Sequence, residues 1–194
     1  MTETVTENKS LTLPLVALRD IVIYPHMTVN LDIGRKESIA AVRLAGKGDR
    51  YIVTAMQKNG AIDVPETDDL YRVGTVIKIN QMLQLPGGLI RILAEGVSRV
   101  AIRSIRITDH GFQADVDDLE ETPASDELRA EAYRRTILKN FFEWLHNTKQ
   151  GLPDDQMEQL KLITDPGETA DFVSAQLLRS EERRVGKECR SRWS

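Results

Sequence analysis

Three histidines, His26, His110 and His146, are the first side chains in this sequence that could do chemistry. They lie far apart in the chain, and none has neighbouring ligands at the spacing of a metal site. The single cysteine, Cys189, excludes an internal disulfide bond and a cluster of cysteine ligands. We therefore interpret the histidines as surface or structural residues and expect no metal ion.

Motifs for nucleophilic catalysis and for phosphate binding are missing as well. The chain has no Gly-x-Ser-x-Gly segment and no glycine-rich loop that ends in Gly-Lys-Ser or Gly-Lys-Thr. Residues 185–188, Val-Gly-Lys-Glu, contain a Gly-Lys pair but lack the upstream glycine and the hydroxyl residue. A serine paired with a lysine stays open on spacing alone, although no pattern points to one. We expect no catalytic residue and no cofactor in this chain.

Arg99, Arg103 and Arg106 are candidates for nucleic-acid binding, because they can form a basic strip on one strand pair. No aromatic residues alternate with them, as a surface for single strands would require. Residues 1–180 hold 21 basic and 27 acidic residues, a net charge of −6. This charge disfavours nucleic acid as a partner and leaves RNA binding as the weakest alternative. We interpret the arginines as surface charges on a sheet.

Membrane and export signals are also missing. No apolar run approaches the roughly 20 residues that span a bilayer. Residues 1–10 are polar and lack the layout of a signal peptide, so we expect a disordered leader there. The sequence therefore predicts a cytoplasmic protein without a membrane partner.

Short segments of alternating apolar residues predict a β-rich domain over residues 11–118. A phase slip near Arg103 and Ser104 indicates a β-bulge. One short helix is expected over residues 36–48. Several short strands with one helix in about a hundred residues favour a small, partly closed β-barrel. Its interior is expected to hold Val73, Ile77, Ile79, Leu93 and Val100.

An acidic linker over residues 119–124 separates this domain from a helical segment over residues 125–180. Apolar residues recur there at three- and four-residue spacing, which predicts three helices, the first capped by Ser125. The third begins at Asp165 with Pro166 in its first position. The predicted fold class is α+β, a small β-barrel followed by a helical subdomain.

Two features of the helical segment bear on its role. Phe142 falls outside the apolar stripe of the first helix, so we expect it at a contact between subunits. Residues 181–194 lose the apolar periodicity and contain five basic residues and the only cysteine. We interpret them as an unrelated, artefactual tail.

Two blocks of this sequence resemble the amino-terminal domain of bacterial Lon proteases. The first is Pro-Leu-x-x-Leu-Arg-Asp-x-Val-x-x-Pro-x-Met at residues 14–27, followed by Gly34, Arg35 and Ser38. The second, at residues 69–102, contains Val-Gly-Thr-Val, Gln-Met-Leu-x-Leu-Pro-x-Gly and Glu-Gly-x-x-Arg. Both blocks occur in the family's order and separation, and the resemblance covers roughly residues 11–180.

The resemblance implies a PUA-like β-barrel and a helical bundle that is cut short in this chain. In that family the region recognises unfolded or damaged proteins and helps to assemble a hexamer with other copies of itself. An ATPase module that binds ATP and Mg²⁺ and a protease module with a Ser-Lys dyad follow it. Both modules are absent here, so the resemblance implies no catalysis by this fragment, whereas the parent protein would be an ATP-dependent serine endopeptidase.

Residues 80–89, NQMLQLPGGL, join two predicted strands and carry apolar side chains where turns are normally polar. We expect this tip and a preceding turn to form one exposed apolar patch that binds unfolded chains, since methionines adapt to varied partners. Its residues are Tyr24, Pro25, His26, Met27, Met82, Leu83, Leu85 and Pro86. A tip folded over the barrel mouth stays open as an alternative. So does a stand-alone ligand-binding barrel of the same fold, without protease modules.

Overall fold

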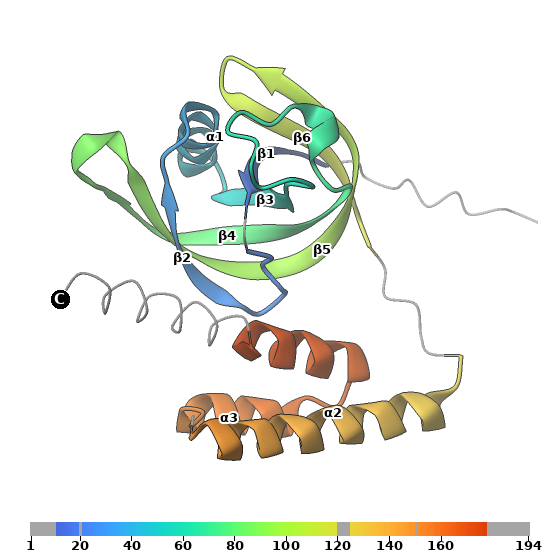
Figure 1. Ribbon diagram of the computed structural model, residues 1–194. Helices are drawn as coiled ribbons and strands as arrows, with labels where there is room; N and C mark the ends of the chain where they lie inside the picture. Colours follow the sequence, from blue (N-terminus) through green and yellow to red (C-terminus); the bar gives the residue numbers. More distant parts are fainter. Residues whose placement is uncertain (1–10, 20, 120–124, 150, 178–194) are drawn as a thin grey trace, which may run out of the picture. The chain divides into compact units, whose positions relative to one another are not determined.

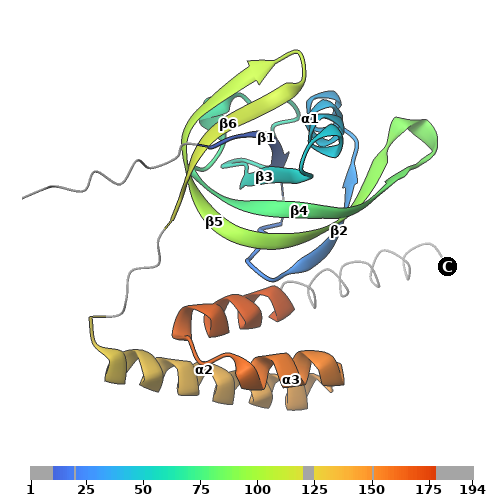
Figure 2. The same cartoon turned by 180° about the vertical axis from the view of Figure 1, so that it is seen from behind.

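The computed structural model describes residues 11–19, 21–119, 125–149 and 151–177. The chain divides into two compact units, Met1–Glu120 and Glu121–Ser194 (Figures 1 and 2). The predicted α+β class is confirmed, with a ring of strands in the first unit and helices in the second. The predicted leader and the tail from residue 181 lie outside the described residues, as does most of the predicted linker.

The first unit is built from six described strands and one α-helix. Their bounds are β1 (Leu11–Leu18), β2 (Thr28–Ile33), α1 (Lys36–Lys47), β3 (Tyr51–Met56), β4 (Val73–Gln84), β5 (Ile90–Thr108) and β6 (Gly111–Asp118). The strands lie in the order β2-β5-β4-β3-β1-β6, and β6 also pairs with β5, which closes the ring. Only β1 and β3 run parallel among these pairs.

Strand β5 is long enough to serve both ends of the barrel. Its first residues lie between β2 and β4, and its last residues pair with β6. The register shifts between Ile102 and Ser104, which confirms the bulge predicted there. A bulge bends and twists a strand, and this bend lets one strand contribute to two walls.

Apolar side chains from five strands, β1, β3, β4, β5 and β6, fill part of the barrel interior. This core cluster contains Leu15, Val53, Leu70, Val100 and Phe112, all at most 3% exposed. The interior prediction for Val73 is wrong, because this side chain is 54% exposed. The register of β4 shifts between Val76 and Ile77, and this shift reverses the alternation of side chains along the strand. Odd-numbered residues therefore point inward at Ile77 and Ile79, but not at Val73.

The second unit contains α2 (Glu127–Thr148), α3 (Asp154–Leu162) and a further helix over residues 166–177. The prediction of Ser125 as the first cap is wrong. The cap is its neighbour Asp126, whose carboxylate accepts a hydrogen bond from the Arg129 N–H at 2.9 Å. Asp165 caps the third helix as predicted, accepting from the Glu168 N–H at 2.8 Å. The core of this unit is formed by Phe141, Leu145, Leu160 and Val173.

Candidate functional site

The end of the β4–β5 hairpin stands out from the first unit in both views (Figures 1 and 2). The register of β4 with β3 ends at Lys78, and the following residues of β4 are in register with β5 alone. The loop is a short 3-10 turn in which Gly87 and Gly88 have φ of +80° and +83°. Glycine suits these positions because other residues rarely adopt them.

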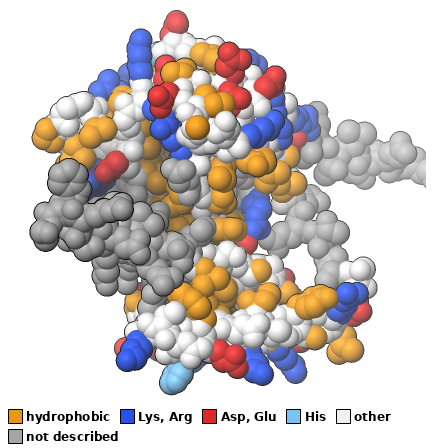
Figure 3. Space-filling view, in the orientation of Figure 1, with side chains coloured by type: hydrophobic (Ala, Val, Ile, Leu, Met, Phe, Trp, Pro, Cys, Tyr) orange, Lys and Arg blue, Asp and Glu red, His pale blue; other side chains and the backbone are white. Residues whose placement is uncertain are grey.

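The side chains at this hairpin end are apolar and mostly exposed. Met82 is 39% exposed, Leu83 59% and Leu89 40%. Pro86 is exposed and Leu85 is half-buried. Figure 3 shows hydrophobic side chains at this projecting edge of the first unit. We call these five residues the apolar tip. It does not fold over the barrel mouth, so the alternative left open by the sequence is excluded.

Two glycines hold the base of the apolar tip in place. A Cβ atom at Gly46 would lie 2.9 Å from Met82 Cε, and one at Gly34 would lie 2.8 Å from Leu89 Cδ2. Met82 and Leu89 therefore pack against backbone at the two ends of α1. Leu83 points to the other face, because side chains alternate along a strand. The tip thus offers one free apolar side chain and two that are anchored on one side.

The turn at residues 24–27 is bound to the other end of the same sheet. The His26 N–H donates to the Gly96 carbonyl at 2.8 Å, and the Gly96 N–H donates to the Met27 carbonyl at 2.9 Å. A side chain at Gly96 would collide with the Tyr24 carbonyl, so this close approach requires glycine. The Met27 side chain is 4% exposed, and its predicted place in an exposed patch is wrong. Met27 is two residues before Val29, whose side chain points inward from β2, so the alternation along the strand already predicts that Met27 points inward as well.

The two halves of the predicted patch do not meet. Thr28, at the start of β2, pairs with Glu95, whereas Ile33 at its end pairs with Ile90 beside the tip. Six extended residues span about 20 Å, so β2 keeps the turn and the tip apart. Of the turn residues, His26 is exposed and Tyr24 and Pro25 are half-buried. The prediction of a single patch is wrong, and only its tip half remains a coherent surface.

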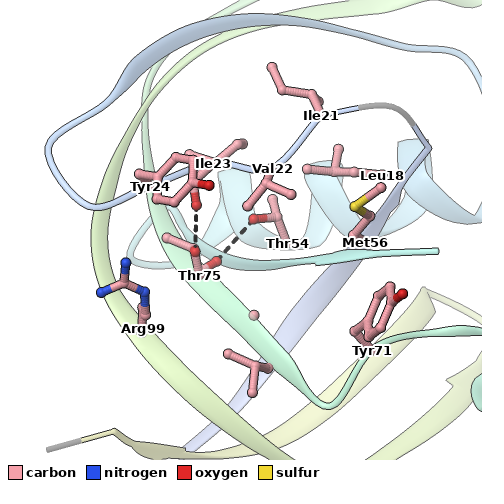
Figure 4. A pocket seen from close by; sticks show the side chains of 12 residues that line it. Leu18, Ile21, Val22, Ile23, Tyr24, Thr54, Met56, Tyr71, Thr75 and Arg99 are labelled. Carbon is pink, nitrogen blue, oxygen red and sulfur yellow. Dashed lines mark hydrogen bonds between the residues drawn. The ribbon is translucent and has the colours of Figure 1, made fainter. Parts of the chain in front are cut away.

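Tyr24 contributes instead to a cavity of about 310 Å³ (Figure 4). The Thr75 hydroxyl donates to the Ile23 carbonyl at 2.6 Å, and the Thr54 hydroxyl donates to the Thr75 carbonyl at 3.1 Å. With these hydroxyls bonded, the cavity wall is largely apolar. Its lining comes from residues Leu18, Ile21, Val22, Ile23, Tyr24, Thr54, Met56, Tyr71, Val73, Gly74, Thr75 and Arg99. No local pattern in the sequence predicts this cavity, because its lining comes from four separate segments.

Charged side chains near these surfaces are paired with each other. Arg91 Nε and Nη2 donate to the two carboxylate oxygens of Asp32 at 2.6 and 2.7 Å. This hydrogen bonding lowers the pKa of Asp32. The ion pair joins β2 to β5, and in the register Arg91 is also opposite Leu83 of β4, so the pair lies next to Leu83 on the sheet. It holds the sheet below the tip in register.

The histidines and arginines that were candidates for metal or nucleic-acid binding do not gather into one site. His26, His110 and His146 are all exposed, and no group of three potential metal ligands occurs within the described residues. Arg103 is paired with Asp117, and Arg106 with Asp115 on β6 at 2.8 Å.

Phe142 is 42% exposed on α2, next to the buried Phe141. Across the described part of the chain, no helix is long and apolar enough to cross a membrane.

Comparison with known proteins gives a consistent result. Residues 12–185 match the family model of the ATP-dependent protease La (LON) substrate-binding domain, so the match extends past the predicted start of the tail. The chain is 36% identical over 165 residues to a Lon protease of Escherichia coli (strain K12) and 34% identical over 165 residues to one of Desulforamulus reducens. These alignments cover 85% of this chain but only 21% and 20% of the relatives, so the chain spans about a fifth of their length.

A solved structure shares the fold. The N-terminal domain of a Lon protease from the Mycobacterium avium complex superposes with a TM-score of 0.60 at 18% identity. The superposition covers 84% of this chain and 98% of that domain. The ring of strands and the following helices are therefore an arrangement already known in solved structures.

Proposed function

The chain belongs to the LON substrate-binding domain family, and from this premise we propose that it binds unfolded or damaged proteins through the apolar tip. The binding serves an ATP-dependent serine protease whose ATPase and protease modules lie outside this chain. The chain itself has no catalytic role and holds no cofactor. Its other partners are further copies of itself in a cytoplasmic hexamer.

The observation that supports this proposal is the exposure of Met82, Leu83 and Leu89 on a projecting hairpin. Exposed apolar groups on a domain surface usually mark a binding site. A convex tip with a methionine and leucines makes few demands on the shape of its partner. Unfolded proteins share exposed apolar side chains but no common shape, and such a surface suits them.

The test replaces Leu83, which at 59% is more exposed than Met82 or Leu89. Leu83→Ser should weaken binding to a reduced, carboxymethylated and permanently unfolded protein about tenfold, because the contact buries most of one leucine. The affinity is measured by fluorescence anisotropy, with circular dichroism to show that the fold is intact. Ile107→Ser is the matched control, since Ile107 is 62% exposed on β5, outside the tip. Equal effects of the two substitutions would remove the tip from the account.

The second unit serves assembly in this proposal. Phe142 is exposed beside a core in which Phe141 and Trp144 stack at 6.0 Å, so its ring is free to enter a contact with another copy. We expect weak self-association of the chain that Phe142→Ser abolishes in sedimentation velocity. A stable hexamer of this chain, or association that survives the substitution, would contradict this role.

The cavity supports a second candidate, a ligand-binding barrel that acts without protease modules. Its volume of about 310 Å³ is at the lower end of small-molecule sites. Binding of a small apolar dye that survives Leu83→Ser but is lost in Val22→Trp, which fills the cavity, would support this candidate. Dye binding that depends on Leu83 would assign it to the tip.

A further inference from the structure

The outer edge of β4 beside the apolar tip has no strand next to it among the described residues. Residues 75–78 of β4 pair with residues 51–54 of β3 in antiparallel register. One residue further along, the Ile79 N–H still donates to the Arg50 carbonyl at 2.8 Å. From Gln81 to Gln84 the only register is with β5. The main-chain groups that point away from β5 in this stretch are therefore available for pairing.

The hydrogen-bond phase identifies these groups. The Leu85 N–H donates to the Leu89 carbonyl at 2.9 Å, so this pair is a bonded one. Bonded and non-bonded pairs alternate in an antiparallel ladder. The N–H and C=O groups of Leu83 consequently point to β5, and those of Met82 and Gln84 point to the outer edge.

The hydrogen bonds on the β2 side of β5 provide a second check on which main-chain groups of β4 point to the outer edge. Gly96 exchanges hydrogen bonds with the turn at residues 26–27 on the β2 side. All residues of this part of β5 are in register with both neighbouring strands, but the direction of their main-chain groups alternates. Ile90 and Ile92, an even number of residues from Gly96, direct their N–H and C=O groups to β2, and Arg91 and Leu93 direct theirs to β4. Two independent sets of bonds thus give the same direction for the free groups of Met82 and Gln84.

This edge lacks the protection that edge strands usually carry. Natural edges are blunted by charged side chains, by proline or by coverage. Gln81, Met82, Leu83 and Gln84 contain no charge and no proline, and they project with the hairpin (Figure 1). Gln81 to Gln84 are all exposed. An unprotected edge with apolar side chains is a template for an added strand.

We propose that an extended segment of an unfolded polypeptide adds to the outer edge of β4 and pairs with the main-chain groups of Met82 and Gln84. This inference rests on the proposed function and specifies how the same site holds its substrate. Main-chain pairing reads no side chain, which fits partners of many sequences. The bound segment must be free of proline at the paired positions, and its apolar side chains contact Leu83 on one face and Met82 on the other.

A second copy of this chain fits the edge less well than an unfolded segment. Four residues of strand are about 13 Å long, and specific interfaces between folded proteins bury at least about 1,000 Å². A short edge gives weak, reversible binding instead. That property suits a domain that must release its substrate.

The test uses two peptides with the same alternating apolar sequence, one of which is N-methylated at the residues that would donate to β4. The methylated peptide should bind about three- to tenfold more weakly to the domain, because it loses one or two hydrogen bonds. Gln84→Pro removes an edge N–H while every side chain of the tip is kept, and it should weaken the unmethylated peptide by a similar factor. Asp109→Pro, in the β5–β6 turn, is the control for proline substitution elsewhere.

The outcomes separate this inference from the proposed function. If Leu83→Ser weakens binding but methylation and Gln84→Pro do not, the tip binds through side chains alone and strand addition is overturned. If neither peptide binds, the proposed function fails as well. If Gln84→Pro changes sedimentation of the domain but not peptide binding, the edge is an interface between copies. The methylation experiment decides the matter on the unmodified protein even if Gln84→Pro does not fold.

Discussion

Strand β4 carries an apolar surface at each end, and the two are built in opposite ways. At the Val73 end, a cavity of about 310 Å³ is lined by four segments, and hydrogen bonds from threonine hydroxyls hold its wall. At the Gln84 end, the apolar tip is convex, and Leu83 is 59% exposed. A concave wall selects a partner by shape, whereas a convex edge accepts partners of many shapes. This difference is why substrate binding is proposed for the tip.

Glycines show the same contrast in the backbone. A Cβ atom at Gly74 would lie 2.6 Å from the Thr54 carbonyl oxygen, and one at Gly96 would meet the Tyr24 carbonyl. At the tip, the neighbours of Gly34 and Gly46 are the ends of flexible side chains. The cavity end is therefore closed by backbone against backbone, and the tip end by side chains that can move.

The largest expected effect is that of Gly96→Ala at the cavity end. The new methyl group would overlap the Tyr24 carbonyl, so the turn must move away from β5 and lose its two hydrogen bonds. We expect a loss of about 3 kcal/mol in the free energy of unfolding, measured by urea denaturation. Gly34→Ala is the matched control, where only Leu89 must rotate. A loss in Gly34→Ala as large as that in Gly96→Ala would show that the two ends do not differ in rigidity.

The next effect concerns binding at the cavity. Val22→Trp should fill the cavity and reduce binding of a small apolar dye there at least about tenfold. Affinity for an unfolded protein should stay within about twofold of the wild type. Val22 precedes the Thr28 end of β2, whereas the tip lies beside the Ile33 end. The measurement is a pair of titrations on the same variant. A parallel loss in both titrations would mean that unfolded chains use the cavity as well.

The sequence predicted the strands and helices far better than it predicted which distant residues lie close together in the fold. Alternation along β2 and β5 and the phase slip near Ser104 were sufficient for the strands and the bulge. The bulge at Val76 left no such signal, so Val73 was assigned to the interior. A bulge is visible in a sequence only where it interrupts a strict alternation, and residues 73–79 contain buried residues in both phases.

The site was half predictable for a related reason. The apolar composition of residues 82–86 was sufficient to predict an exposed binding surface at the tip. These residues are consecutive and belong to one hairpin end, so a local pattern can describe them. Joining it to the turn at residues 24–27 required the register of β2 with β5, which the sequence does not contain. Met27 could have been excluded from its parity with Val29 on the inward face of β2. The cavity depends on four segments and had no local signal at all.

A smaller effect is expected from Gly46→Ala at the base of the tip. Alanine is favoured over glycine within a helix by up to about 1 kcal/mol, and Met82 Cε, 2.9 Å from the new methyl group, can rotate away. We expect a gain of about 0.5–1 kcal/mol in the free energy of unfolding, measured by urea denaturation. A loss of stability would show that Met82 is as rigid as the backbone at the cavity end.

The smallest expected effect is a pH dependence confined to the tip end. The hydrogen bonds from Arg91 lower the pKa of Asp32 below its usual value of 3.8, so folding favours the ionised carboxylate. This contribution is fully present above pH 4 and is lost as the pH falls through the lowered pKa, because the unfolded chain takes up the proton first. The pair is solvent-exposed, and its effect on global stability should be slight. Amide hydrogen exchange of residues in the β2–β5 pairing should therefore accelerate below pH 4, relative to a reference peptide, more than that of residues around the cavity. In Asp32→Asn this extra acceleration should disappear, and its persistence would assign the pH dependence to another carboxylate.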